Sequence, residues 1–289
     1  MRRVGPEGEG EVDRPTMKQV EELLQRTHRV TLELSNLCNL ARAHIRCPAH
    51  YVQHAQVLPA HVVEDVLDTL GRAGFGAGKY IAFHLYNEPL LDPRLVVFIQ
   101  HARARCPEAG IILWSNGWYL TETIARELAA AGVTHFMLSA YSRRAQDRFQ
   151  ALRLHLHESL SACLQAGHLP VYFRIRRCSR LDDRMQMISP PEESDSRPCH
   201  QPLSDLTIRA SGSLGLCCYD WAEKRVFGNL NRQRFADCLA AQFADLMALY
   251  QDLSRGIRDL PVCQACHFPR RRADHRAEWT WPEGTKVFG

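Results

Sequence analysis

The sequence predicts an α/β protein built on a parallel sheet and followed by a smaller cysteine-rich region. Two patterns support this prediction. Short apolar segments alternate with segments of helical spacing as far as Arg177, which is the order of βα units and implies a parallel sheet. Cysteines then become frequent after residues 189–198, a segment rich in proline, serine and acidic residues.

The first part of the chain contains five expected strands. Each is a short, mainly apolar run, and the first of them, "RVTLELS", alternates as a half-buried strand does. The expected strands span residues 29–35, 79–89, 109–117, 133–142 and 170–177.

Helix signals separate these strands. Pro59 and Pro93 stand in first turns, where the missing N–H is tolerated. Gly71 lies near the end of the first helix, and Thr121 is a typical N-cap. The expected helices span residues 58–74, 92–106, 121–132 and most of 143–167.

The composition changes at residues 189–198, which we interpret as a linker or domain boundary. Beyond it we expect a short hairpin over 206–218 and a helix around 234–253. The expected organisation is a flexible leader at 1–20, a core domain at 21–190 and a C-terminal domain at 191–289.

Charge and hydropathy exclude several classes of protein. With 36 basic and 32 acidic residues, the net charge of +4 is too balanced to indicate nucleic-acid binding. No apolar stretch approaches the ~18 residues that cross a bilayer, and the N-terminal residues lack the apolar segment of a signal peptide. We therefore expect a cytoplasmic protein with no membrane partner, in which 11 cysteines favour metal binding over disulfides.

Polar residues follow every expected strand. In parallel βα architectures, ligands bind at the carboxyl ends of the strands. A sheet with a purely structural role would not require this pattern, so we expect a binding site along this edge. The residues concerned are Ser35, Asn36, Cys38, Tyr86, Asn87, Glu88, Ser115, Asn116, Ser139, Tyr141, Arg174 and Arg176.

The stretches "LELSNLCN", "YNEPLLDPRL", "SNG" and "VTHFMLSAYS" together resemble the core of the radical S-adenosylmethionine (SAM) superfamily, over about residues 29–177. The resemblance implies a partial (β/α)6, TIM-like barrel that holds a 4Fe–4S cluster on three cysteines. The open iron of the cluster chelates SAM, and reductive cleavage gives a 5′-deoxyadenosyl radical that abstracts hydrogen from the substrate. Thiolates are the soft ligands that such clusters use.

The same resemblance implies residues that bind SAM. "YNEP" stands where the family has a Gly-Gly-Glu-Pro-like stretch. Glu88 is therefore expected to accept hydrogen bonds from the SAM ammonium group, with Tyr86 and Asn87 beside it. Four residues are expected near the ribose and carboxylate of SAM, although a turn or capping role fits each equally well: Ser115, Asn116, Ser139 and Arg174.

The cluster loop departs from the family pattern. The usual spacing is CxxxCxxC, but Arg42 and Ile45 stand where the second and third cysteines belong. The loop instead offers Cys38, His44 and Cys47, and imidazole does bind iron in Rieske centres. Three interpretations remain open: His44 is the third ligand, a distant cysteine such as Cys106 or Cys178 is the third ligand, or the cluster has been lost.

The C-terminal region resembles the SPASM or twitch extension of radical SAM enzymes, which holds an auxiliary 4Fe–4S cluster. Cys199, Cys217, Cys263 and Cys266 supply the expected four ligands. On spacing alone, a structural zinc site is the alternative. Cys218 could replace its neighbour Cys217. The remaining cysteines are expected to pack as small hydrophobic residues or to be left over: Cys106, Cys163, Cys178 and Cys238.

A single auxiliary cluster resembles twitch-type enzymes that act on aminocyclitols and sugars in natural-product biosynthesis. The expected reaction is dehydrogenation, or epimerisation with Cys178 as the hydrogen-atom donor. A flavodoxin- or ferredoxin-type protein is the expected electron donor. The alternatives are a maturase that modifies a ribosomal peptide, and a non-catalytic zinc- or cluster-binding protein on a degenerate barrel.

Overall fold

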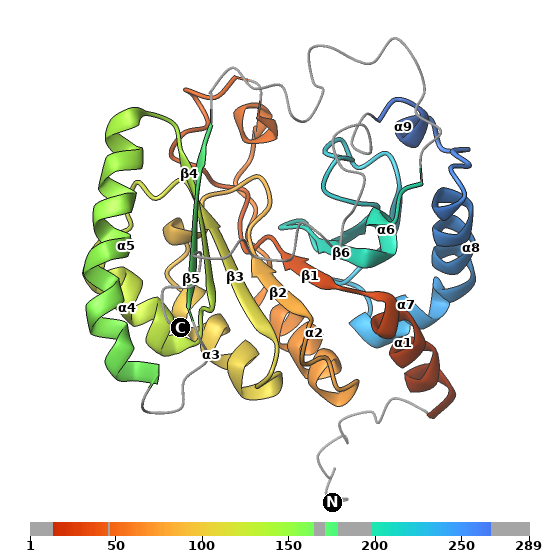
Figure 1. Ribbon diagram of the computed structural model, residues 1–289. Coiled ribbons are helices and arrows are strands. Elements are labelled where there is room, and N and C mark those ends of the chain that lie inside the picture. Colours follow the sequence, from red (N-terminus) through yellow and green to blue (C-terminus); the bar gives the residue numbers. More distant parts are fainter. Residues whose placement is uncertain (1–13, 46, 165–170, 179–197, 267–289) are drawn as a thin grey trace, which may run out of the picture.

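The computed structural model describes residues 14–45, 47–164, 171–178 and 198–266. One eight-stranded sheet forms its centre, in the order β5-β4-β3-β2-β1-β6-β7-β8, and Figure 1 shows the helices along its outer side. The strands are β1 (Arg29–Leu32), β2 (Tyr80–Phe83), β3 (Gly110–Ser115), β4 (His135–Ala140), β5 (Tyr172–Arg177), β6 (Asp205–Ile208), β7 (Ser213–Gly215) and β8 (Val226–Asn229).

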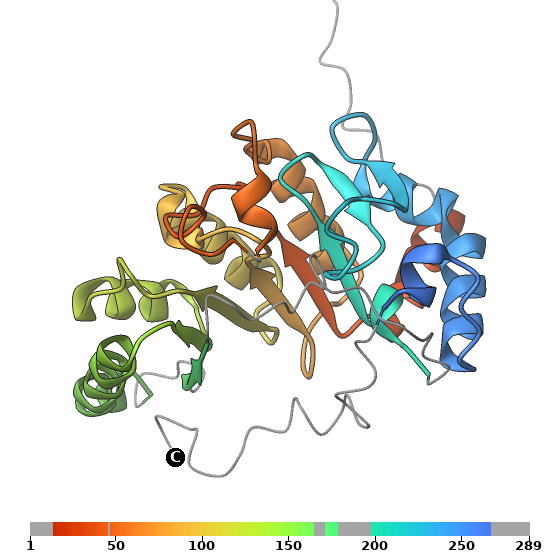
Figure 2. The ribbon, with the colours of Figure 1, turned by 90° about the horizontal axis from the view of Figure 1, so that it is seen from above.

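The first six strands pair in parallel and make the partial (β/α)6 barrel expected from the sequence. The last two, β7 and β8, add in antiparallel fashion beyond β6. Figure 2 shows the sheet from above as an open arc. The helices are α1 (Arg14–Arg26), α2 (Ala60–Arg72), α3 (Leu95–Arg105), α4 (Glu122–Ala131), α5 (Arg143–Leu164), α6 (Gln201–Ser204), α7 (Phe235–Ala241), α8 (Phe243–Ser254) and α9 (Pro261–Gln264), with 3-10 turns η1 (Pro48–Tyr51) and η2 (Pro89–Leu91).

The two faces of the sheet differ in chemistry. Alternate strand residues such as Phe83, Leu113 and Phe136 are buried in the main core between the sheet and the helices. The opposite, inner face has only a small apolar cluster around Ile112 and Met137. The period of two in a strand produces this separation and leaves the inner face available for polar groups.

Helix ends follow the sequence signals. Thr121 caps α4, because its Oγ1 accepts from the N–H of Ile124 at 3.2 Å. Gly132 ends the same helix with a φ of +127°, a conformation that favours glycine. The turn directs the chain into β4.

Three features differ from the expectations. The hairpin expected over 206–218 is present, because β6 and β7 pair in antiparallel fashion, but β6 also pairs with β1 and is the sixth parallel strand. The helix expected at 234–253 is two helices, α7 and α8, that meet at Gln242. Helix α1 begins at Arg14, inside the segment expected as a flexible leader, and packs against α7 and α8. No helix among the described residues has the length and apolar character needed to cross a membrane.

Candidate functional site

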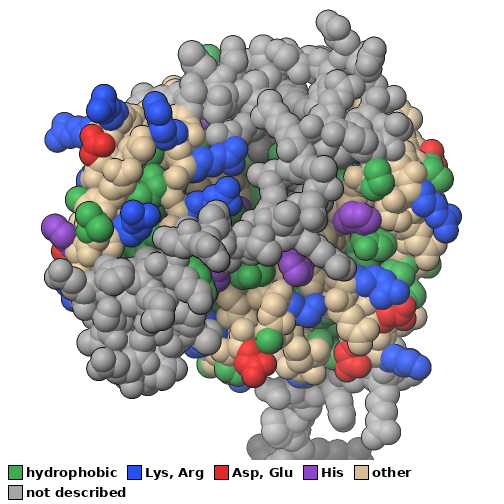
Figure 3. Space-filling model, viewed as in Figure 1, with side chains coloured by type: hydrophobic (Ala, Val, Ile, Leu, Met, Phe, Trp, Pro, Cys, Tyr) green, Lys and Arg blue, Asp and Glu red, His purple; other side chains and the backbone are tan. Residues whose placement is uncertain are grey.

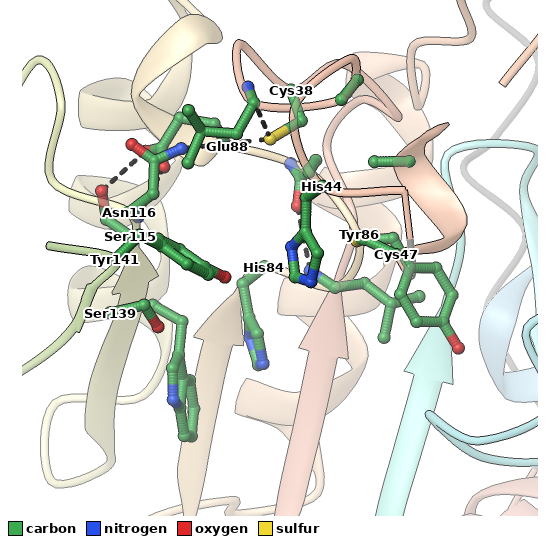
Figure 4. A pocket seen from close by; sticks show the side chains of 16 residues that line it. Cys38, His44, Cys47, His84, Tyr86, Glu88, Ser115, Asn116, Ser139 and Tyr141 are labelled. Atoms are coloured by element: carbon green, nitrogen blue, oxygen red, sulfur yellow. Dashed lines mark hydrogen bonds between the residues drawn. The ribbon is translucent and has the colours of Figure 1, made fainter. Parts of the chain in front are cut away.

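An open pocket lies at the carboxyl ends of the parallel strands. Its empty volume, with the open solvent at its mouth included, is about 610 Å³. The loop between β1 and α2 forms one wall, and the segments after β2, β3 and β4 form the others (Figure 4). The pocket brings together ten residues expected from the sequence: Cys38, His44, Cys47, Tyr86, Asn87, Glu88, Ser115, Asn116, Ser139 and Tyr141.

The loop that carries Cys38, His44 and Cys47 is folded by its own backbone. The N–H groups of Ala41 and Cys47 donate to the carbonyls of Cys38 and His44, at 3.2 and 3.1 Å. His50 supports the same loop through Nδ1, which lies 2.9 Å from the Ala41 carbonyl oxygen. These turns bring the three expected ligands to one pocket although they are not evenly spaced in the sequence.

The two thiols are enclosed. The Cys38 sulfur lies 3.4 Å from the N–H of Leu40 and 3.9 Å from Nδ2 of Asn116, so two donors face it. Burial raises the pKa of Cys38 to about 11 and also raises the pKa of Cys47. Because iron binds thiolates, binding must displace these protons.

His44 completes a donor set that suits iron. Its ring packs edge-on against Tyr141, with centroids 5.4 Å apart. Two thiolates and one imidazole from a single loop beside an open pocket fit an iron–sulfur cluster with a corner free for a ligand. Cys106, an alternative third ligand, lies buried just before β3, at the opposite edge of the sheet, and this position excludes it.

Glu88 is fully buried in the pocket wall and organises it. Its Oε1 accepts from Ser115 Oγ at 2.7 Å and from the N–H of Leu90 at 3.1 Å, and its Oε2 accepts from the N–H of Asn116 at 2.7 Å. Burial raises the pKa of this carboxyl group, while these donors oppose the rise. The side chain therefore holds the Ser115–Asn116 turn in place.

The turn after β3 places Asn116 over the cluster loop. Asn116 Nδ2 donates to Asn39 Oδ1 at 2.8 Å, and its Oδ1 accepts from the N–H of Trp118 at 2.9 Å. Gly117 has a φ of +65°, and a Cβ there would lie 2.3 Å from the ring of Phe149. Only glycine fits this turn against α5.

Sequence reasoning missed a polar bridge between the pocket and the C-terminal region. Glu33 is buried and accepts from the N–H groups of Tyr86 and Ala210, each at 3.1 Å. The Tyr86 hydroxyl donates to the Cys218 carbonyl at 2.5 Å, and Arg209 lies over the Tyr86 ring at 5.2 Å. Glu33 was detectable, because a carboxylate interrupts the apolar run just before Cys38.

His84 and Trp114 were also missed. They stack with ring centroids 4.2 Å apart and line the pocket from adjacent strands. Burial, together with the nearby Arg29 charge, keeps the pKa of His84 well below its usual range, so this ring is neutral at physiological pH. Alternation with Tyr80 and Ala82 along one strand was the available signal.

Arg174 and Cys178 are not among the described residues that line the pocket. Arg174 is exposed on β5, and Cys178 follows β5 with its sulfur 3.6 Å from the Arg176 carbonyl. Figure 3 shows Lys and Arg side chains gathered at the upper left of the visible face, over α5 and β5. The exposed arginines of these elements include Arg143, Arg144, Arg148, Arg174 and Arg176.

A second site lies in the C-terminal region. Cys199, Cys217, Cys263 and Cys266 all line one pocket of about 370 Å³, as expected for an auxiliary cluster. Cys199 is tied to α8 by its N–H, which donates to the Leu253 carbonyl at 2.7 Å. Within the described ranges, no three His, Cys, Asp or Glu side chains are arranged to hold one metal ion.

The second site is crowded with thiols. Burial raises the pKa of Cys217 well above its usual range, and neighbouring Cys218, Cys266 and Cys199 raise it further. Four thiol groups around one pocket, one of them receiving the Tyr219 N–H at 3.4 Å, fit a cluster with four protein ligands. Cys218 does not line this pocket and instead lies 3.7 Å from Gln201 Nε2.

The other expected packing cysteines have separate locations. Cys106 and Cys238 are buried in the main core, as expected for small hydrophobic residues. The side chain of Cys163 lies outside the described residues.

Comparison with known proteins matches this picture. Residues 199–267 match the model of the SPASM iron–sulfur cluster-binding domain. The S-adenosyl-L-methionine-dependent 2-deoxy-scyllo-inosamine dehydrogenase of Niallia circulans is 24% identical over 243 residues, which cover 82% of this chain and 92% of that protein. The structure of BtrN in complex with AdoMet and 2-DOIA matches with a TM-score of 0.65 and 21% identity, covering 83% of this chain and 93% of BtrN. The structure of BtrN in an open conformation matches with a TM-score of 0.59 and 18% identity, covering 83% of this chain and 92% of BtrN.

The chain is thus similar in fold to BtrN and in sequence to a SAM-dependent dehydrogenase, as the cysteine loop at the mouth of its partial barrel led us to expect. Its C-terminal region is a SPASM iron–sulfur cluster-binding domain, whose β6 completes the barrel and whose four cysteines share one pocket.

Proposed function

We propose that the chain is a radical SAM dehydrogenase that oxidises a carbinol carbon of a small polar substrate, such as an aminocyclitol or a sugar. The observation that carries the proposal is the presence of two cysteine sites on one chain: an open one at the barrel mouth and a four-cysteine one beside it. The 24% identical relative is named as a dehydrogenase of an aminocyclitol, which supports the substrate class.

Cys38, His44 and Cys47 would hold the first cluster, and the four C-terminal cysteines would hold the second. When bound, the first cluster and SAM supply a 5′-deoxyadenosyl radical that removes a hydrogen atom. The second cluster supplies an acceptor for the second electron. His44 is proposed as the third ligand because it lines the pocket with both cysteines, whereas Cys106 is remote and Cys178 lies outside the described lining.

The remaining pocket residues bind and orient. Glu88 is proposed to receive the SAM ammonium group at Oε2 while it holds the Ser115–Asn116 turn. Tyr86, Asn87, Asn116 and Ser139 supply further polar contacts for SAM or substrate. Arg174 is exposed on the adjacent strand, and a SAM carboxylate contact there stays a prediction.

Dehydrogenation is favoured over epimerisation by the position of Cys178. A hydrogen-atom donor must reach the substrate radical, but the Cys178 sulfur faces the Arg176 carbonyl, outside the described pocket lining. The Cys178→Ala variant should therefore keep product formation. A flavodoxin- or ferredoxin-type protein is proposed to deliver the electron that starts each turnover.

The test is anaerobic incubation of iron-loaded protein with SAM, dithionite and 2-deoxy-scyllo-inosamine or related aminocyclitols. We expect 5′-deoxyadenosine, together with a carbonyl product in equal amount. The matched control is the Cys263→Ala/Cys266→Ala variant, which should still form 5′-deoxyadenosine but lose the carbonyl product. Absence of 5′-deoxyadenosine from protein with a full iron complement would rule out the proposed chemistry.

A further inference from the structure

Arg258 is a buried cation in the wall of the four-cysteine pocket. It is 8% exposed and lines the pocket together with all four cysteines. Its Nη1 donates to the Cys263 carbonyl at 2.9 Å, and the same carbonyl accepts from the N–H of Cys266 at 3.2 Å. The guanidinium is therefore fixed against the turn that presents Cys263 and Cys266.

A buried carboxylate, that of Asp220, has the charge opposite to that of Arg258. Asp220 is 1% exposed, and its carboxylate accepts from the N–H groups of Lys224 and Arg225, at 2.8 and 2.9 Å. The backbone N–H of Asp220 donates to the Cys217 carbonyl at 3.2 Å, so this acid is fixed beside another cysteine of the pocket. Both charges thus act on the sulfur ligands from fixed positions.

Such charges matter for electron transfer. Four thiolates make a cluster site negative, and an added electron makes it more negative still. Net charge and solvent exposure set the reduction potential of iron–sulfur clusters, and charges interact strongly where water is excluded. A fixed cation favours the reduced form and a fixed anion favours the oxidised form.

We propose that Arg258 makes the auxiliary cluster an effective electron acceptor, and that Asp220 limits this effect. This inference rests on the proposed function. There, a CH–OH carbon becomes C=O by losing a hydrogen atom to the adenosyl radical, a proton to solvent and one electron to the auxiliary cluster. Arg258 offsets the negative charge that this electron adds.

A purely structural role for Arg258 makes a different prediction. If the guanidinium only holds the Cys263 turn, its loss should change iron content without a systematic change in potential. If its charge matters, then removing Arg258 and removing the Asp220 charge should move the potential in opposite directions. Arg255 is a matched control because it lies three residues away but is exposed.

The experiment is an EPR-monitored redox titration of the holoenzyme variants Arg258→Met, Arg258→Lys, Asp220→Asn and Arg255→Met. Added SAM perturbs the signal of the first cluster and so identifies the signal of the auxiliary one. We expect Arg258→Met to lower the auxiliary potential by at least a tenfold change in the reduction equilibrium, or about 59 mV for one electron. Arg258→Lys should retain most of the wild-type potential, Asp220→Asn should raise it, and Arg255→Met should match wild type.

Equal potentials for Arg258→Met and Arg255→Met, at full iron content, would overturn the proposal. If Arg258→Met fails to load the cluster, Asp220→Asn decides: a raised potential supports the proposal and an unchanged one overturns it. The titration needs no substrate turnover. Its failure is therefore distinguishable from failure of the proposed dehydrogenation, which the 5′-deoxyadenosine and carbonyl-product assays report.

Discussion

His44 is the proposed third ligand of the first cluster, in a loop that lacks the CxxxCxxC spacing. We predict that His44→Ala reduces the iron content of anaerobically purified protein from about eight to about four per chain, because the first cluster loses a ligand. His44→Cys should keep the iron but lower the potential of that cluster, since imidazole ligands raise potentials relative to thiolate. Iron analysis and redox titration measure both effects.

His50→Ala is the control for this loop. His50 is exposed, and Nδ1 contacts the Ala41 carbonyl rather than the pocket. It should retain the full iron content. Loss of iron in both variants would show that loop folding, and not ligation by His44, sets the iron content.

His135 gives the protein a pH-dependent stability. Burial lowers the pKa of His135 to about 3, below the ~6.5 of an unfolded histidine. The folded state thus prefers the neutral ring, so the stabilisation is fully present above pH 6.5 and is lost as the pH falls towards 3. Between pH 8 and pH 5 we expect His135 alone to contribute a loss of about 2 kcal/mol in the free energy of unfolding.

Urea unfolding of the cluster-loaded protein at the two pH values measures this loss. His135→Phe keeps a ring to stack on Tyr172 and should remove about 2 kcal/mol of the pH dependence. His61→Phe, at an exposed position of α2, should keep the wild-type dependence. Identical pH dependence in the two variants would contradict the assignment.

At this scale, the sequence could indicate residues whose type carries the chemistry. Cys38, Cys263 and Cys266 are recognisable because thiols cluster for few other reasons. Arg209 and His84 were not recognisable from the sequence. Their roles depend on which face of a strand points inward and on which residues of a distant segment pack against that face. That information lies in the tertiary pairing, which local patterns do not contain.

Helices and strands with a clear apolar period were predictable from the sequence. Helices α2 to α4 and strands β1 to β5 have apolar periods that match their local structure, so sequence and structure agree on them. Strand β6 was assigned to a hairpin because the chain does turn into β7 after it. Its parallel pairing with β1 joins residues about 176 positions apart, and no local signal reports such a contact.

The turn between β3 and α4 depends on Gly117. We predict that Gly117→Ala destabilises the protein by about 2–5 kcal/mol. A positive φ costs a non-glycine residue about 1–2 kcal/mol, and the new Cβ would lie 2.3 Å from the Phe149 ring, a clash that typically costs about 1–3 kcal/mol. The displaced Asn116 should also weaken SAM binding.

Gly74→Ala separates strain from clash. Gly74 has the same φ of +65°, but a Cβ there meets no heavy atom within 4 Å. It should cost only about 1–2 kcal/mol and leave SAM binding unchanged. Chemical denaturation and equilibrium SAM binding compare the two variants, and equal losses would mean that Phe149 gives way without resistance.

The whole molecule is held together by a sheet that crosses the border between barrel and SPASM domain. Strand β1 pairs with β2 on one side and β6 on the other. The buried ion pair between Arg29 and Asp205 links β1 to β6, with Thr31 Oγ1 donating to Asp205 at 2.8 Å and Gln201 Nε2 at 3.2 Å. Gln201 in turn lines the four-cysteine pocket. Because of this connection, we expect the two cluster regions to unfold together.

Asp205→Asn tests that expectation. The substitution leaves the buried Arg29 charge uncompensated, which typically costs about 3–5 kcal/mol. Tryptophan fluorescence and the visible absorbance of the clusters should lose signal in one coincident transition, at lower denaturant than in wild type. Asp245→Asn is the control, because it removes the ion-pair partner of Arg225 at a side chain that is 61% exposed. It should lower the free energy of unfolding by no more than about 1 kcal/mol. Separate transitions for the two probes would show instead that barrel and SPASM domain fold independently, despite the strands they share.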